Sequence, residues 1–205
     1  MSMSDQDDDR FRAAWEADAR LLMNDLLLIH FHRELWSSVV KAVGERASRA
    51  DQTWQMHYSR LYIDSQAMAI RRVVRSNNKD PHVSLNSLLL RLEDQPHIVG
   101  LSAQEISQDR SQLNRVADDV ISWADQTVAH VHKSPTAHAL ELDRLDSAIK
   151  EVADTFISYA GKVTRTHFLI DDPLPSPRWR SVFFNPLFDA PSWWPGTSEA
   201  GPSQG

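Results

Sequence analysis

Two histidines and one aspartate lie close together in this sequence, at Asp125, His130 and His132. Histidine is the side chain best suited to general acid–base catalysis near neutral pH, and a neighbouring carboxylate can orient its ring. The three residues fall where a helical pattern ends, just before Ser134 and Pro135. We therefore take them as the candidate catalytic group. In the alternative interpretation, His130 caps the last carbonyls of a helix and His132 is simply exposed.

The spacing of the histidines limits the chemistry that they can perform. His-x-His occurs twice, at His30/His32 and at His130/His132. Residues two apart on a helix point about 200° away from each other, so this pattern predicts no metal site. The chain also has no glycine-rich phosphate loop, no Gly-x-Ser-x-Gly and no His-Glu-x-x-His. The sequence therefore indicates no cofactor.

A group of arginines lies on an earlier helical segment, at Arg71, Arg72 and Arg75. Guanidinium groups bind phosphate through paired hydrogen bonds, so these residues are the candidate anion-binding group. From a neighbouring helix they could face His130. The alternative is a solvated helix face whose charges pair four residues apart.

Apolar residues recur at helical spacing through the first 170 residues, and no strand-like alternation is found. We expect helices over 9–44, 51–76 and 84–93, a fourth from Ser102 toward residue 133, and a fifth from Ser134-Pro135 to about residue 169. Ser102 and Glu105 form a capping-box pattern, and Ser84 is a plausible cap. The sequence predicts an all-α, antiparallel helical bundle of four long helices and one short helix.

The helical faces give expectations for single residues. In the fourth helix, a step of 100° per residue places His130 opposite the apolar stripe, on the face that carries Trp123 and Gln126. The first helix carries two adjacent apolar columns with seven-residue spacing, which we expect to share one buried side. These columns are Ala14, Leu21, Leu28, Leu35 and Ala42, and Trp15, Leu22, Ile29, Trp36 and Val43.

The ends of the chain differ in composition from the middle. Residues 1–8 are acidic and are expected to be disordered. The helical bundle is expected to span residues 9–170. Seven of the ten prolines and a set of large aromatic side chains lie in 171–205. Proline excludes a regular helix, while the aromatic groups favour burial. We expect 173–195 to dock along the bundle or a partner, and 196–205 to be disordered. The aromatic residues are Trp179, Phe183, Phe184, Phe188, Trp193 and Trp194.

Composition narrows the class of protein. The formal net charge is −6, which is unlike a dedicated non-specific nucleic-acid binder. There is no cysteine, which removes disulfides and thiolate chemistry. The longest apolar stretch, 21–31, is interrupted by Asn24, Asp25 and His30, so no membrane span is expected. The first residues lack the pattern of a secretory signal, and we expect a cytoplasmic protein.

Several short motifs resemble the HEPN-like helical domains of the abortive-infection U type, over about residues 10–170. The resemblance implies an α-helical bundle, a homodimer and a link to phage defence or RNA metabolism in prokaryotes. The motifs are Ile70-Arg71-Arg72, then a polar loop, then Val83-Ser84-Leu85-x-x-Leu88-Leu89, then Ala124-Asp125-x-x-x-Ala129-His130, followed by Leu142, Ile149 and Tyr159.

Active HEPN ribonucleases carry an arginine a few residues before a histidine. His130 matches that histidine, but the arginine would fall where this chain has Trp123, Ala124 and Asp125. A carboxylate there would repel a phosphate rather than stabilise it. We therefore expect a HEPN-like module in which ribonuclease activity, if present, is metal-independent. The alternative is a non-catalytic dimeric scaffold or protein-interaction module that uses the aromatic segment 173–195.

Overall fold

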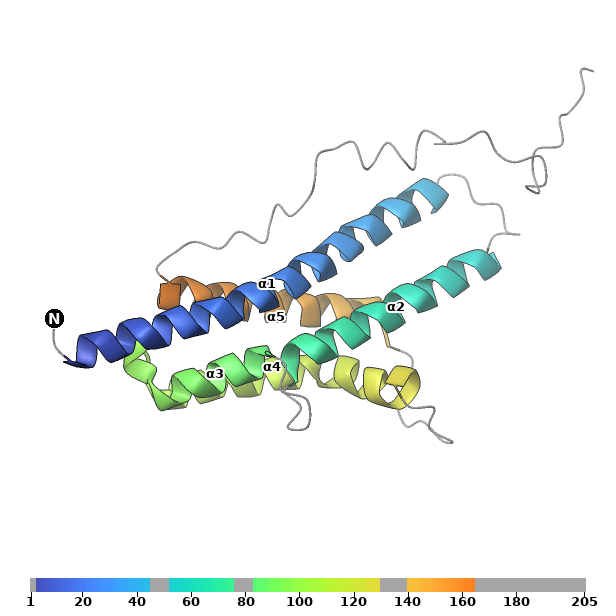
Figure 1. Ribbon diagram of the computed structural model, residues 1–205. Helices are drawn as coiled ribbons and strands as arrows, with labels where there is room; N and C mark the ends of the chain where they lie inside the picture. The colour runs from blue at the N-terminus through green and yellow to red at the C-terminus, as the bar shows by residue number, and fades with distance from the viewer. Residues whose placement is uncertain (1–2, 45–51, 76–82, 130–139, 165–205) are drawn as a thin grey trace, which may run out of the picture.

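The computed structural model describes residues 3–44, 52–75, 83–129 and 140–164, and these contain helices and short connections without a strand (Figure 1). The expectation of an all-α chain is confirmed for them. None of the helices within these ranges has the length and apolar character that crossing a membrane requires. The elements are α1 (Met3–Gly44), α2 (Gln52–Val74), α3 (Leu85–Asp94), the 3₁₀ turn η2 (Pro96–Ile98), α4 (Ala103–Trp123), the π-helical segment η3 (Ala124–Ala129) and α5 (Leu142–Thr164).

Two helices begin at the serine caps that the sequence predicts. Ser102 Oγ accepts a hydrogen bond from the Glu105 amide at 3.2 Å, and the Ser102 amide donates to the Glu105 carboxylate at 2.7 Å. Ser84 caps α3 in the same reciprocal way, with Ser87 as its partner. Each box satisfies backbone donors that the first turn of a helix leaves unpaired.

The first and last long helices have different bounds from those expected. α1 begins at Met3, so residues 3–8, predicted to be disordered, are helical. Asp8 in this part of α1 lies 3.0 Å from His97 Nε2, which links the acidic end to η2. α5 begins at Leu142 rather than at Pro135, because the Glu141 carbonyl accepts the first helical hydrogen bonds.

Only one of the two apolar columns of α1 is buried. Trp15, Leu22 and Ile29 are buried, whereas Leu21 and Leu28 are 60% and 52% exposed. The two columns lie about 100° apart, and α1 is covered by α5 on one side and by α2 and α3 on another. The expectation that both columns share one buried side was therefore wrong.

Arg12 holds one end of the molecule together. Its guanidinium donates to the Val163 carbonyl at 2.6 Å and to the Ile98 carbonyl at 2.8 Å. Both acceptors lie at or beside the carboxyl ends of helical elements, where backbone carbonyls lack helical partners. One side chain of α1 thus ties down the end of α5 and the turn after α3.

α1 and α2 run antiparallel, side by side (Figure 1). The rings of Trp36 and Tyr62 stack with centroids 4.9 Å apart, and further along the pair Arg72 lies 3.1 Å from Asp25. The order of these contacts, rising along α1 and falling along α2, shows the antiparallel direction. Arg71 lies near the end of α2 and Arg75 follows directly after that helix; both are described below.

Adjacent leucines on α3 test the assignment of its buried face. Leu89 is fully buried and Leu90 is 50% exposed. Leu89→Ala should lower the free energy of unfolding by about 2–5 kcal/mol, because it leaves a cavity in the core. Leu90→Ala should change it by less than about 0.5 kcal/mol. Urea unfolding followed by circular dichroism measures both, and equal losses would contradict the packing described here.

Candidate functional site

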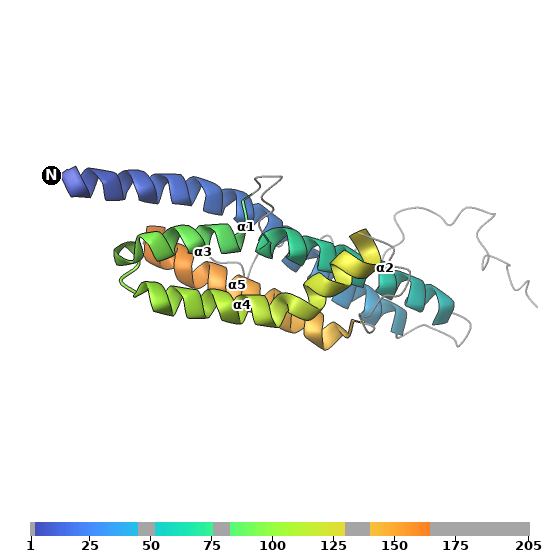
Figure 2. The same cartoon turned by 90° about the horizontal axis from the view of Figure 1, so that it is seen from below.

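The helix that leads toward His130 changes its geometry before it reaches that residue. α4 is a regular α-helix through Trp123, and residues 124–129 then form the π-helical segment η3. A π-helix has more residues per turn than an α-helix, so a step of 100° no longer places side chains beyond Trp123. In Figure 2 this yellow end of α4 turns toward α2, and η3 packs on α2. The predicted continuous α-helix was therefore wrong in this stretch.

Trp123 is buried rather than placed on an open face. Its indole Nε1 donates to Asp64 of α2 at 2.9 Å, and the Arg60 guanidinium lies 4.4 Å from its ring centroid. Arg60 and Asp64 also pair with each other at 2.8 Å. The face of α4 opposite its apolar stripe is therefore covered by α2 at this level, which the helical spacing of α4 alone did not indicate.

Asp125 is the centre of the site that the structure describes. Its two carboxylate oxygens accept from two arginines, Oδ1 from Nε of Arg71 in α2 and Oδ2 from Nη1 of Arg75, the residue directly after α2. The Asp125 side chain is about one quarter exposed. Two guanidinium groups thus converge on one anion, which is also the way in which arginines bind a phosphate. Here the anion is supplied by the chain itself.

Arg72 does not join this pair. It lies 3.1 Å from Asp25 of α1, whereas its neighbours Arg71 and Arg75 reach η3. The structure therefore brings two of the three predicted anion-binding residues together and directs the third to another helix. Neighbouring residues differ by about 100° around a helix, which explains the separation of Arg71 from Arg72.

The two histidines of the candidate catalytic group, His130 and His132, lie outside the described residues. Within the described part, both carboxylate oxygens of Asp125 are engaged by arginines. The expectation that Asp125 tunes His130 therefore stays a prediction. Its carboxylate already has a charge-assisted partner on each oxygen.

Sequence reasoning identified Arg71 and Arg75 but overlooked Arg60 and Asp64, which complete this polar surface. Arg60, Asp64, Arg71 and Arg75 follow one another at spacings of four, seven and four. Such spacing places all four on one side of a helix, where they meet Trp123 and Asp125. The signal was present in the sequence, but the partner helix could not be identified without the fold.

A second polar cluster lies between α1 and α5. Arg33 binds Asp146 through two hydrogen bonds of 2.8 Å, and both line a surface cavity together with His30. The hydrogen bond to Asp146 raises the pKa of Arg33. Burial, reinforced by the charge of Asp146, raises the pKa of the nearby Tyr62 hydroxyl. The paired hydrogen bonds of Arg33 and Asp146 make this cluster a structural tie between α1 and α5.

Among the described residues, no three histidine or carboxylate side chains gather closely enough to hold a metal ion. Comparison with known proteins identifies no relative: no family model matches the chain, and no curated protein or solved structure matches it.

A double-mutant cycle tests whether Asp125 and Arg71 interact as described. With Asp125→Asn and Arg71→Met, we expect a coupling energy of about 0.5–1.5 kcal/mol, because the pair is partly shielded from water. Urea unfolding of the four proteins measures it. The exposed pair Glu16 and Arg20 is the matched control and should show a smaller coupling. A cycle for Asp125 and Arg71 that gives no coupling would contradict the contact.

Proposed function

We propose that this protein is a HEPN-like helical module of prokaryotic defence or RNA metabolism that binds a partner rather than cuts RNA. It is proposed to be an antiparallel bundle of four long helices and one short helix, and to act as a homodimer. One observation supports the absence of cleavage: Asp125 holds Arg71 and Arg75 on its two carboxylate oxygens. Two of the three arginines expected to bind phosphate are thereby committed to an internal anion.

The physical argument concerns charge in the transition state. Cleavage of RNA by an acid–base histidine builds negative charge on the phosphate, and a nearby guanidinium lowers that barrier. A carboxylate on the same guanidinium groups cancels part of their charge and repels the substrate phosphate. For Arg71 or Arg75 to assist cleavage, the phosphate would have to displace Asp125. The arrangement therefore argues against RNA cleavage assisted by Arg71 or Arg75.

An RNA assay with three proteins tests this proposal. The wild type should leave a single-stranded RNA intact in the presence of EDTA, and His130→Ala should behave identically. Asp125→Asn releases two guanidinium groups and should bind the same RNA roughly three- to tenfold more tightly at low salt. Fluorescence anisotropy and gel electrophoresis measure binding and cleavage. The matched control is Asp154→Asn, which removes an exposed carboxylate from α5.

Cleavage by the wild type that disappears in His130→Ala would overturn the proposal. It would establish instead a metal-independent endoribonuclease with His130 as acid–base residue and Asp125 and His132 as supporting groups. In that case Arg71→Ala should also lower the cleavage rate. Equal RNA affinity of the wild type and Asp125→Asn would show that the arginine pair is not an anion site.

A second candidate function is a non-catalytic dimeric scaffold, in which 173–195 contacts a protein partner. The observation that favours it is the concentration of exposed apolar groups on α1 and α2. Six of the eight large hydrophobic side chains exposed in the described residues lie on these two helices. Apolar groups gathered on one surface are typical of interaction sites. Light scattering that gives a monomer at all concentrations would exclude a dimer.

A further inference from the structure

One face of the α1–α2 pair carries exposed leucines. Leu21 and Leu28 of α1 are 60% and 52% exposed, and Leu61 of α2 is 50% exposed. Each directly precedes a buried residue of its own helix. In two antiparallel helices, the residues that precede the inward-facing positions point to the same side of the pair. The three leucines therefore belong to one surface, which we call the outer leucine face.

An ion pair across the two helices supports this placement. Asp25 and Arg72 also precede buried residues of α1 and α2, and their side chains meet at 3.1 Å. Their contact shows that residues in this register do share one side. Asp25 lies between Leu21 and Leu28 in the sequence of α1, so the ion pair interrupts the apolar surface near its middle.

The end of α5 lies beside Arg12 of α1, nine residues and therefore about 180° around the helix from Leu21. A chain that reaches the outer leucine face from there passes around α1, which is ~10 Å across. Arg12 of α1 donates to the Val163 carbonyl at 2.6 Å, one residue before α5 ends at Thr164. The chain therefore continues from a point next to Arg12, and the exposed Leu21 follows on α1 within three turns. Figure 1 shows the orange end of α5 against the blue half of α1.

The remaining chain has the length and the side chains to cover the face. Leu28 lies about 24 Å along α1 from Arg12, at ~1.5 Å per residue. The segment from Thr164 to Trp179 spans about 45 Å when extended at ~3.1 Å per residue. Beyond it follow the large aromatic residues of 179–194, and seven of the ten prolines lie in 171–205. A proline-rich extended segment loses little entropy when it binds an apolar surface.

We propose that residues 173–195 pack intramolecularly on the outer leucine face of α1 and α2, covering Leu21, Leu28 and Leu61 with tryptophan and phenylalanine side chains. A tethered segment has an effective concentration in the millimolar range, so it occupies the face ahead of a second copy or a partner at cellular concentration. A partner of this face must displace the segment first. The inference does not depend on whether the protein cleaves RNA.

Site-specific cross-linking of the full chain tests this proposal. The sequence has no cysteine, so a pair of introduced cysteines is unique. Asn24→Cys lies on an exposed position of α1 between Leu21 and Leu28, and Ser181→Cys lies among the aromatic residues of the segment. A short bis-maleimide should join positions 24 and 181 within one chain, detected by peptide mass spectrometry of the monomer band.

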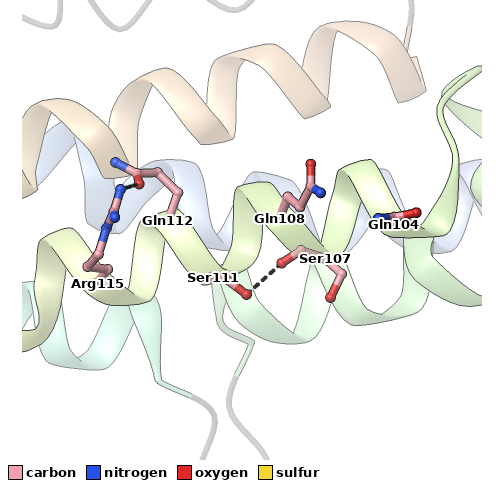
Figure 3. A pocket seen from close by; sticks show the side chains of 6 residues that line it. All are labelled: Gln104, Ser107, Gln108, Ser111, Gln112 and Arg115. Carbon is pink, nitrogen blue, oxygen red and sulfur yellow. Dashed lines mark hydrogen bonds between the residues drawn. The ribbon is translucent and has the colours of Figure 1, made fainter.

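The matched control replaces position 24 by an exposed serine of α4. Ser111→Cys with Ser181→Cys should cross-link at least roughly fivefold less. The polar face that carries it is shown in Figure 3. Its side chains are Gln104, Ser107, Gln108, Ser111, Gln112 and Arg115.

Charge substitutions complete the test. Leu21→Glu and Leu28→Glu, added together to the protein with cysteines at 24 and 181, should reduce cross-linking to the level of the control. Leu90→Glu, on the exposed surface of α3, should leave the cross-linking of positions 24 and 181 unchanged. Circular dichroism verifies that each variant is helical. Equal cross-linking at positions 24 and 111 would overturn the proposal. A covalent dimer as the main 24/181 product would do so too, because the segment would then occupy a second copy.

Discussion

The carboxylate of Asp125 between the guanidinium groups of Arg71 and Arg75 is the contact on which the end of α4 depends. The regular α-helix stops at Trp123, and the chain beyond it has widened into a π-helix. A π-helix is less favourable than an α-helix and persists where other contacts hold it. The two ion pairs, together with the buried Trp123, attach this stretch to α2. Removing the carboxylate would leave two like charges side by side without their shared partner.

The same contact sets the chemical character of the site. Two arginines that converge on one point form an anion site, and the only question is which anion occupies it. In this chain an internal carboxylate does, at the position where the HEPN-like resemblance would lead one to expect an arginine. The proposed function rests on this replacement of an expected positive charge by a negative one. The carboxylate of η3 occupies the guanidinium groups of Arg71 and Arg75. The described part of η3 therefore ends, at Ala129, four residues after a carboxylate that ties it to α2.

The sequence predicted those features that depend only on residues close together in the chain. The capping box at Ser102 and the cap at Ser84 depend on residues three apart, and both were predicted, although the reciprocal partner of Ser84, Ser87, was not. The widening after Trp123 was not, because a helical period assumes a constant step per residue. The choice between the Leu21 and Leu22 columns also could not be made, since it depends on where α5 and α2 pack. For the same reason the arginines could be grouped from the sequence but not assigned to Asp125 and Asp25.

Nε of Arg71 donates to Asp125 and reports directly on which anion the arginine pair holds. Its N–H signal in a ¹⁵N-edited NMR spectrum, assigned with Arg71→Lys, can be followed while a single-stranded RNA oligonucleotide is added. If Asp125 keeps the arginine pair, the signal should be slow to exchange with water and should stay in place as RNA is added. The contradicting result is an Arg71 Nε–H signal that shifts as RNA is added to the wild type and ends at the chemical shift found for Asp125→Asn with RNA. That result would show that phosphate displaces the carboxylate.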